Sequence, residues 1–388
     1  MQILISGAGV AGPAVATALG RRGVEVTVVE AAAKLRTSGF AVDFRGETHM
    51  SVLRELGVLD ELKAVQTHGG AMQAVDEHGT EIFRLPEEFA GGDVEVRRSD
   101  LSRILYERSL EHADYLFGDT ITGLTEAADG VRVDFARAES QTFDMVIGAD
   151  GMHSAVRRLA FGPERDYVKH LGYYIAGWDL PNGHGYGTTP MQYNVPGRMA
   201  SVSADSRDPD RAGALFVFTG PSVDVDWRDL GRQKSMIADA FGGMRWHVPY
   251  LLDTLRDVDE MYFDSISRVR VPEWTKGRIA LLGDAAWGVT LGGMGVGTGV
   301  VGAYVLAGEL ALARGDHRVA FSAYEQRMRA YAGRWQKGAS PGQFLAPSNA
   351  ALLWLRNAMF RTRAVQKMMV AGTTKLANDV ELPAYPAA

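Results

Sequence analysis

Gly7-Ala8-Gly9-Val10-Ala11-Gly12 follows the apolar run Ile3-Leu4-Ile5 and precedes Glu30 by eighteen residues. The apolar run predicts a buried parallel strand, residues 13–22 predict an Ala-rich helix, and residues 24–29 predict a second strand. A strand, a helix and a strand within about 30 residues form one βαβ unit. Its glycines allow a tight turn, the close approach of a pyrophosphate, and tight packing of helix against strand.

This βαβ unit predicts a dinucleotide site. The N-terminus of its helix presents unpaired N–H groups to phosphates. Glu30 is expected to accept hydrogen bonds from an adenosine ribose, and its charge disfavours a 2′-phosphate there. Gly7, Gly9, Gly12 and Glu30 are therefore predicted cofactor residues, for NAD or FAD rather than NADP. A glycine-rich turn without a ligand is the alternative, but the strand, the spacing, the helix and the acid all agree.

A second motif separates NAD from FAD. Residues 278–282 predict another buried strand, which delivers Asp284 at its carboxyl end, where open α/β sheets bind ligands. A glycine-rich loop over residues 291–299 follows, with Gly295 near the start of a predicted helix. Such a helix N-terminus can stabilise the negative charge of a reduced flavin. A plain Asp-capped turn is the alternative for this stretch taken alone.

The pattern along the rest of the chain predicts its organisation. Residues 165–265 hold six of the 14 prolines, many aromatics and short β-like segments, whereas the pattern after residue 293 is helical. Other predicted elements are a hairpin of Met72–Val75 and Glu81–Leu85, strands at 131–135 and 144–148, helices at 48–65 and at 99–112 with Ser99 as N-cap, and a helix or helix pair over about 350–376.

These elements predict an α/β fold, α+β overall. A Rossmann-like FAD-binding domain is expected to be discontinuous, with residues 1–164 and 266–345. A mostly β substrate-binding domain, residues 165–265, is inserted into it, and a C-terminal helix and tail cover residues 346–388. Tyr173, Tyr174, Trp178, Tyr193 and Trp246 fall in the β domain, where most are expected in the core and one or two in a substrate pocket.

Composition excludes several classes of protein. The net charge is −6 and no basic run occurs, which argues against nucleic-acid and membrane partners. The absence of cysteine excludes disulfides, Cys-ligated zinc, iron–sulfur clusters and a thiol nucleophile. The nine histidines show no metal-ligand spacing, so no metal site is expected. No apolar run reaches the ~20 residues of a membrane span, and we expect a cytoplasmic protein.

A third motif spans residues 144–157 and contains Asp150-Gly151. With the three motifs in this order, the sequence resembles the FAD-dependent aromatic hydroxylases, the class A flavoprotein monooxygenases with the p-hydroxybenzoate hydroxylase fold. The resemblance covers nearly the whole chain. The segment Arg97-Arg98-Ser99-Asp100-Leu101 and the chain length look most similar to the tetracycline-inactivating monooxygenases and their actinobacterial relatives.

The resemblance implies roles for individual residues. Glu30 should bind the ribose, Arg98 the pyrophosphate or ribityl region of FAD, and Asp284 a ribitol hydroxyl, although Arg97 could exchange roles with Arg98.

Four further residues take implied roles. Asp43 matches a position near the flavin, and Arg45 lies in the same segment. Arg36 matches an arginine implicated in NADPH use, and Asp150 belongs to a motif linked to FAD and NAD(P)H. For Arg36 and Arg45 a solvated surface arginine is the alternative.

The chain departs from the family pattern around the second motif. Trp287 follows Gly-Asp-Ala-Ala where His or another aromatic is usual, and Leu291 arrives without the usual proline. The loop is one residue short, and Gly302 replaces an acidic residue on the following helix.

The resemblance also implies the activity. NADPH or NADH, a transient co-substrate, would reduce a non-covalently bound FAD, O₂ would add at C4a, and the hydroperoxide would transfer oxygen to a small aromatic or polycyclic substrate, tetracycline-like or polyketide-derived. Because the flavin does this chemistry, no catalytic side chain is expected. A flavin-dependent halogenase, whose Trp-x-Trp-x-Ile-Pro segment is absent, and a non-catalytic ligand-binding flavoprotein are the alternatives. Hydroxylation, epoxidation and Baeyer–Villiger insertion stay open, and a monomer or weak homo-oligomer is expected.

Overall fold

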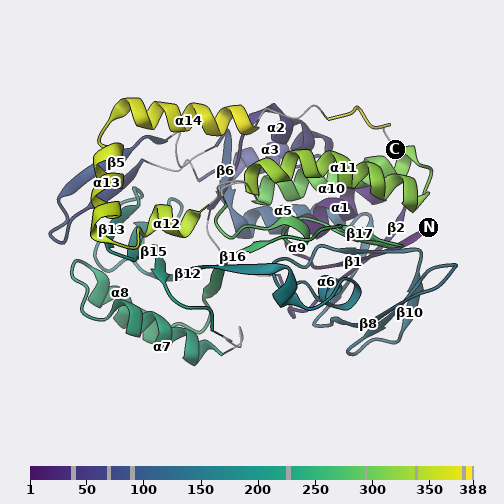
Figure 1. Ribbon diagram of the computed structural model, residues 1–388, viewed down its shortest axis with the longest axis horizontal. Coiled ribbons are helices and arrows are strands. Elements are labelled where there is room, and N and C mark those ends of the chain that lie inside the picture. The colour runs from purple at the N-terminus through teal and green to yellow at the C-terminus, as the bar shows by residue number, and fades with distance from the viewer. Residues whose placement is uncertain are drawn as a thin grey trace.

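The computed structural model describes residues 1–35, 41–67, 71–87, 92–223, 229–292, 295–336, 340–377 and 382–386. Two large sheets lie one beyond the other along the longest axis of the molecule (Figure 1). The first sheet and its helices carry the glycine motifs, and the second sheet carries most of the inserted domain.

The first sheet has six strands in the order β17-β18-β11-β1-β2-β7. Their bounds are β17 (Thr275–Lys276), β18 (Ile279–Leu281), β11 (Met145–Gly148), β1 (Gln2–Ser6), β2 (Glu25–Glu30) and β7 (Ala113–Phe117). All neighbours are parallel except β17 and β18. Helix α1 (Ala11–Gly20) joins β1 to β2, so the predicted βαβ unit is confirmed.

Strand β18 returns to β11 more than 130 residues after it in the chain. Because β1, β11 and β18 are parallel, their carboxyl ends meet at one edge of the sheet. This edge gathers the Gly7–Gly12 loop, Asp150 and Asp284, which are far apart in sequence. The three motifs therefore form one site.

Helices cover the first sheet. These are α5 (Arg98–Ser109), α6 (Ala155–Ala160), α9 (Asp284–Trp287), α10 (Gly295–Leu312) and α11 (His317–Gln336). Helix α10 packs against both α1 and α11. Among the helices described, only α10 has the length and apolarity of a membrane span, but 78% of it is buried inside the protein. It is the core helix of this domain.

Two predicted helices need correction. The helix expected at 48–65 is two helices, α2 (Gly46–Glu55) and α3 (Leu59–Ala64), because Gly57 between them has φ 72°. The helix expected at 99–112 is α5. It begins one residue before Ser99, so Ser99 is not its N-cap. Arg97, the last residue of β6 (Val94–Arg97), takes that position, since strand and helix follow each other without a turn.

Smaller sheets complete the first domain. Strands β8 (Ile121–Glu126), β9 (Val131–Phe135) and β10 (Gln141–Phe143) form an antiparallel sheet at one end of the molecule (Figure 1). Strand β3 (Ala41–Phe44) pairs with β6.

The second sheet has seven strands in the order β16-β12-β15-β14-β13-β4-β5. Their bounds are β16 (Tyr262–Val269), β12 (Val168–Pro181), β15 (Arg211–Thr219), β14 (Arg198–Ala204), β13 (Met191–Val195), β4 (Met72–Val75) and β5 (Glu81–Leu85). The hairpin β4–β5, expected within the first domain, extends this sheet instead. It does so because Ala74, Phe83 and Leu85 bury their side chains against Phe360, near the C-terminus.

Two helices of the inserted domain were missed by the sequence analysis. Helices α7 (Leu230–Phe241) and α8 (Val248–Arg256) cover one face of the second sheet. The C-terminal part contains α12 (Pro341–Leu345), α13 (Ala350–Phe360) and α14 (Arg363–Ala377), which confirms a helix pair near the C-terminus. Helix α12 packs on β12 and β15, and a short 3-10 helix, η1 (Glu164–Asp166), precedes β12.

Candidate functional site

The Gly7–Gly12 loop turns from β1 into α1 with no room for side chains on its inner side. Gly7 has φ 105°, and a Cβ there would lie 2.6 Å from the carbonyl oxygen of Ala149. A Cβ on Gly12 would lie 1.8 Å from the carbonyl oxygen of Gly7, whereas one on Gly9 would meet nothing within 4 Å. Val10 supplies no side-chain cap, so N–H groups of the first turn of α1 remain for a ligand. The loop is a cradle that fits a pyrophosphate.

Glu30 ends β2 at the rim of this cradle. The Ala8 N–H donates to its Oε2 at 2.7 Å, and the Ala32 N–H donates to its Oε1 at 2.9 Å. Both bonds hold the carboxylate in place. Each oxygen keeps a further lone pair, so the group can accept hydrogen bonds from a ribose.

Asp284 begins α9 directly after β18 and faces the start of α10. Its Oδ1 lies 3.3 Å from the position a Cβ would take on Gly295. Burial raises the pKa of Asp284, and the positive charge of Arg98 opposes that rise. Within the described part of the chain, no donor is hydrogen-bonded to this carboxylate, which leaves it available to a ligand hydroxyl.

The structure distinguishes the two neighbouring arginines. Arg97 forms an ion pair with Asp205, in the loop between β14 and β15 of the second domain. Beside it, Arg207 of the same loop binds Asp100 at 2.6 Å. Arg97 is thus engaged between the domains, and Arg98 is the one whose charge acts on Asp284.

Asp150 is bound to the start of α6. Its Oδ2 accepts hydrogen bonds from the N–H groups of Ala155 and Val156 at 2.8 and 3.1 Å, and from Ser6 Oγ at 3.2 Å. Ser154 Oγ donates to its Oδ1. Burial raises the pKa of Asp150. In this structure the carboxylate joins β1 to α6, and its contact with a cofactor stays a prediction.

Arg157 is a site residue whose role the sequence analysis missed. Its side chain is fully buried, and it donates to the carbonyl oxygens of Met152 at 2.6 Å and Ala285 at 2.9 Å. It also lies 3.6 Å from Glu164. Arg157 therefore ties the third motif to the second. The sequence signal was its place as the last residue of the third motif, which gave no partner for it.

His153 links the same motif to the second sheet. Its Nδ1 lies 2.9 Å from Glu164 Oε1 and its Nε2 lies 3.3 Å from Asp264 Oδ1, on β16. Burial disfavours the charged ring, but the hydrogen bonds to the two carboxylates prevail and raise the pKa of His153 to about 9. The protonated ring is thus a structural bridge between η1 and β16.

Asp43 and Arg45 lie at the end of β3. Arg45 Nε donates to Asp43 Oδ2, and only 9% of Arg45 is exposed, so a solvated surface arginine is wrong for this position. Burial raises the pKa of Asp43, against the charge of Arg45. Arg36 lies outside the described residues.

His49, a second missed residue, supports this segment. Its Nδ1 accepts from the Arg45 N–H at 3.0 Å, and burial lowers its pKa to about 4. The neutral ring therefore carries its proton on Nε2, which lies 2.8 Å from Tyr331 Oη. A Cβ on Gly297 would lie 2.4 Å from His49 Cε1, so the ring packs against the first turn of α10.

The short loop after Trp287 is held along β16. The Val269 N–H donates to the Gly288 carbonyl at 2.8 Å, and Thr290 Oγ1 donates to the Ser265 carbonyl at 3.0 Å. Leu291 has φ 56°, an uncommon value for a non-glycine residue. The loop before α10 is therefore attached to the second sheet as far as Gly292.

The five aromatic residues of the inserted domain divide between the faces of its sheet. Tyr174, Trp178, Tyr193 and Trp246 belong to the core under α7 and α8. Tyr173 belongs instead to an apolar cluster on the opposite face, which also includes Leu291. Only Tyr173 of the five thus lies on the face near Leu291, in the loop between α9 and α10.

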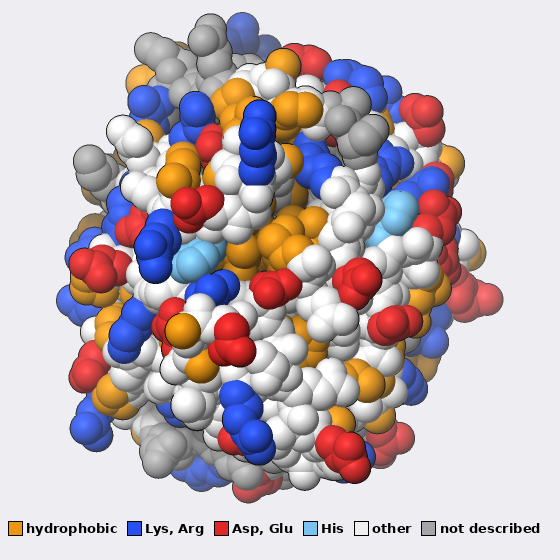
Figure 2. Space-filling view, turned by 90° about the vertical axis from the view of Figure 1, so that its right-hand side faces the viewer, with side chains coloured by type: hydrophobic (Ala, Val, Ile, Leu, Met, Phe, Trp, Pro, Cys, Tyr) orange, Lys and Arg blue, Asp and Glu red, His pale blue; other side chains and the backbone are white. Residues whose placement is uncertain are grey.

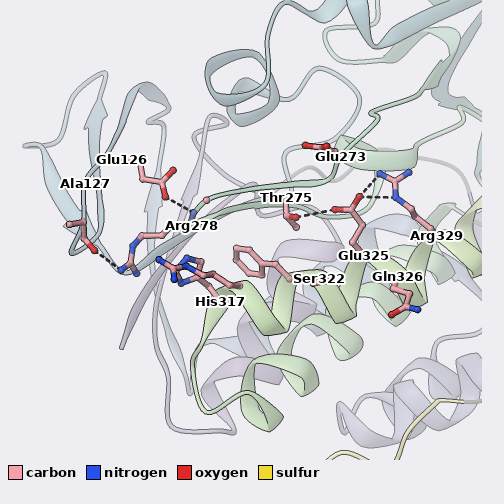
Figure 3. Close-up of a pocket in the computed structure, with 14 residues that line it drawn as sticks. Glu126, Ala127, Glu273, Thr275, Arg278, His317, Ser322, Glu325, Gln326 and Arg329 are labelled. Atoms are coloured by element: carbon pink, nitrogen blue, oxygen red, sulfur yellow. Dashed lines mark hydrogen bonds and ion pairs between the residues drawn. The ribbon is translucent and has the colours of Figure 1, made fainter.

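A separate cavity of about 730 Å³ lies between the end of β8, the segment around β17, and α11. Figure 3 shows its lining, in which Glu126 accepts from the Arg278 N–H at 2.9 Å and Glu325 accepts from Thr275 Oγ1 at 3.1 Å. None of the predicted cofactor residues lines it, so it is not the cofactor site.

Figure 2 looks onto the end of the molecule at the right of Figure 1 and shows a hollow floored by hydrophobic side chains and rimmed by charged ones.

Known proteins are similar to this chain along most of its length. Residues 1–177 match the family model described as FAD binding domain. A flavin-dependent monooxygenase of Legionella longbeachae is 35% identical, covering 87% of each chain, and an uncharacterized protein of Mycobacterium tuberculosis is 37% identical, covering 86% of this chain and 91% of its own.

A solved structure agrees with these relatives. The tetracycline destructase Tet(51) is 30% identical, covers 99% of both chains and has a TM-score of 0.84. The glycine cradle, the carboxylate at its rim and the aspartate after β18 fit FAD. The chain belongs to the class A FAD-dependent flavoprotein monooxygenases.

Proposed function

We propose that this FAD-dependent monooxygenase consumes NADPH or NADH and O₂ to hydroxylate a bulky, largely planar molecule with several polar groups, such as a tetracycline-like or other polyketide-derived ring system. The observation that carries this proposal is the similarity over 99% of both chains to the tetracycline destructase Tet(51). A layer of apolar and polar side chains on the second sheet, buried beneath α12 on the face opposite α7 and α8, is the candidate wall of the substrate site.

The apolar part of this surface is the cluster that contains Tyr173. Its buried members are Tyr173, Ile175, Met199, Val217, Ile266 and Ala346, with Leu291 of the flavin loop packed against them. Such a wall suits a planar ring system. Because Leu291 belongs to the loop between Asp284 and α10, the wall adjoins the proposed flavin site.

The polar part lies on β13 and β14. Gln192 pairs in register with Ser201, and Asn194 pairs with Met199, so all four side chains share the face of the apolar cluster. Gln192 is 3% exposed and donates to Asn194 Oδ1 at 2.7 Å. Buried amide and hydroxyl groups beside an apolar wall would give several hydrogen bonds to a polycyclic ligand with oxygen substituents. The 30% identical tetracycline destructase supports this substrate class.

A small phenolic acid fits less well. It would call for a free cation, and Arg356 is the guanidinium bound to this surface. Its donors go to Asn194 and Asn357 side chains at 3.0 and 2.8 Å and to the Leu345 carbonyl at 2.9 Å. Arg356 is thus already committed to holding α12 and α13 in place.

The chain's own residues would bind and orient the cofactor. The Gly7–Gly12 cradle would take the pyrophosphate, Glu30 the ribose, and Asp284 with Arg98 the ribityl chain. The positive end of α10 would face the flavin ring. When bound, FAD supplies the oxygen chemistry, and the protein positions it and excludes water. A second Gly-x-Gly-x-x-Gly spacing, residues 297–302, lies within α10 and not in a turn between a strand and a helix. This supports a transient nicotinamide without a Rossmann unit of its own, with Arg36 as its proposed contact.

The test measures NADPH and NADH oxidation by the FAD-loaded enzyme with p-hydroxybenzoate-sized and tetracycline-sized compounds, and counts hydroxylated product per nicotinamide. Polycyclic compounds should stimulate oxidation with good coupling. Gln192→Leu should raise KM for them about tenfold, whereas the control Gln73→Leu, one strand away on the opposite face, should not. Efficient coupling with small phenols and none with polycyclic compounds would overturn the substrate class. Ligand binding without any stimulated oxidation would favour a non-catalytic flavoprotein.

A further inference from the structure

The C-terminal region has an unusual distribution of charge. Asp and Glu stop at Glu325 and resume at Asp379, and the 53 residues between them contain nine Lys and Arg. The whole chain carries a net charge of −6. This region therefore has an excess of positively charged residues, although the net charge of the chain is negative.

Helix α13 exposes apolar side chains in this region. Trp354 is 71% exposed, Leu355 49% and Met359 44%, and Ala351 is exposed as well. Their spacing of i, i+3, i+4 and i+8 places them on one side of the helix. The other side is anchored to the protein, because Phe360 packs on Phe83 of β5 with ring centroids 5.5 Å apart.

Basic side chains follow directly at the junction of α13 and α14. Arg361, Arg363 and Lys367 are exposed, and Met368 beside them is 66% exposed. Arg361 also donates to the Ile82 carbonyl at 3.1 Å, which keeps the junction close to β5. Figure 1 shows α13 at one end of the molecule and α14 along its upper edge. The exposed side of α13, with this junction, forms a basic apolar corner.

We propose that the basic apolar corner docks on an anionic lipid surface. Trp354, Leu355 and Met359 enter the boundary between headgroups and acyl chains, and Arg361, Arg363 and Lys367 bind lipid phosphates. Tryptophan suits such a boundary because its ring is apolar and its N–H can reach water or a headgroup. The acidic remainder of the chain orients this corner toward the surface.

The charges favour lipid over a second copy of the chain. A two-fold dimer through this corner would bring the same patch of each copy together, with Arg361, Arg363 and Lys367 facing like charges. An anionic bilayer complements the cations and the apolar side chains at once. From the net charge of the whole chain we expected no membrane partner. The proposal departs from that expectation, because a net charge summed over the chain does not show a local excess of cations.

The test is flotation of the full-length, FAD-loaded protein with vesicles of phosphatidylcholine alone or with 30% phosphatidylglycerol. The protein should float with the anionic vesicles, and increasing salt should release it. The triple variant Trp354→Ser/Leu355→Ser/Met359→Ser should lose at least about tenfold in vesicle partitioning, and Arg361→Gln/Arg363→Gln/Lys367→Gln a similar amount. Far-UV circular dichroism and retained FAD check that both fold.

Matched controls carry the same changes elsewhere. Leu312→Ser/Val319→Ser removes exposed apolar side chains of α10 and α11, and Arg103→Gln/Arg165→Gln/Arg256→Gln removes three exposed arginines. Both should bind vesicles like the parent. Equal binding by the α13 variant, no binding to anionic vesicles, or a dimer in sedimentation velocity that the α13 variant abolishes would each overturn the proposal.

Discussion

Trp287 and Gly302 are two departures from the family pattern that explain each other. The Trp287 ring packs on Trp274 with centroids 4.5 Å apart, and its Nε1 donates to Thr298 Oγ1 at 3.2 Å. A Cβ on Gly302 would lie 3.0 Å from Trp287 Cη2 and 2.9 Å from Leu282 Cδ1. The larger ring at 287 therefore requires the absence of a side chain at 302. In the sequence the two departures are fifteen residues apart, and nothing there relates one to the other.

Gly302→Ala should destabilise the protein by about 1–3 kcal/mol, because the added methyl group overpacks the space between Leu282 and Trp287. Trp287→Phe removes the ring atoms nearest to residue 302, so the double variant should recover part of the loss. Chemical denaturation of the four proteins measures this coupling. The control is Gly333→Ala in α11, where a Cβ meets nothing within 4 Å; it should be neutral or stabilising. Additive losses in the double variant would contradict the pairing.

Asp284→Ala should weaken FAD binding about 10- to 100-fold, because it removes the carboxylate proposed to hold a ribitol hydroxyl. Fluorescence titration of the apoprotein with FAD measures the dissociation constant. Asp253→Ala, at an exposed position of α8, should leave it unchanged, because that aspartate forms a surface ion pair with exposed Arg256 at 3.2 Å. A protein that stays yellow through dilution and dialysis after Asp284→Ala would argue against this anchor.

One side chain, Arg356, adds hydrogen bonds to the packing of helices α12 and α13 on the second sheet. Arg356, on α13, donates to the Leu345 carbonyl at the end of α12 and to Asn194 of β13, while Asn194 Nδ2 also donates to that carbonyl at 2.8 Å. Burial lowers the pKa of Arg356 to about 10. A buried cation with neutral acceptors is tolerated because its N–H groups are all directed at oxygen atoms. The covering of the proposed substrate surface thus depends on Arg356.

Arg356→Leu should loosen α12 and α13 rather than unfold the protein. It removes one donor from the Leu345 carbonyl and one from Asn194 Oδ1, which keep Asn194 Nδ2 and Gln192 as donors, at a cost of about 1–3 kcal/mol. Hydrogen exchange followed by mass spectrometry should show faster exchange in residues 341–360 and little change in β1 and β2. Arg318→Leu, an exposed arginine at the start of α11, serves as the control. Unchanged exchange in 341–360 would show that other contacts hold these helices.

The two domains are joined by polar contacts that span long distances in the chain. Arg97 binds Asp205, Arg207 binds Asp100, and His153 bridges η1 and β16. The loop between α9 and α10 also runs along β16. The proposed cofactor site and the proposed substrate surface are therefore held in one arrangement by charges as well as by packing.

His153 makes part of the stability depend on pH. Its folded-state pKa of about 9 lies above the 6.5 of the unfolded chain, so its contribution is complete below pH 6.5 and is lost as pH rises through about 9. The difference in unfolding free energy between the parent and His153→Gln should therefore shrink from pH 6.5 to pH 9. Denaturation at several pH values measures it. His78→Gln, at an exposed histidine, should show no such trend, and a difference that grows with pH would contradict the assignment.

Much of the molecule follows from local sequence. The βαβ unit, the hairpin and the strands at 131–135 and 144–148 were predicted correctly, because apolar periodicity and glycine turns act over a few residues. The three motifs could be assigned to one site because parallel strands end at a common edge. The break at Gly57 and the start of α5 at Arg98 were missed, since each depends on the backbone conformation of one residue.

Contacts between distant segments were decided only by the tertiary structure. The sequence allowed Arg97 and Arg98 to exchange roles, and the fold distinguishes them, because Arg97 pairs with Asp205 whereas the charge of Arg98 lowers the pKa of Asp284 against the effect of burial. Likewise the hairpin of residues 72–85 joined the second sheet because Phe360 covers its apolar side. A side chain's type and spacing define what it can bind, but its partner comes from a segment 100 or more residues away. Long-range packing selects that partner, and no local pattern records it.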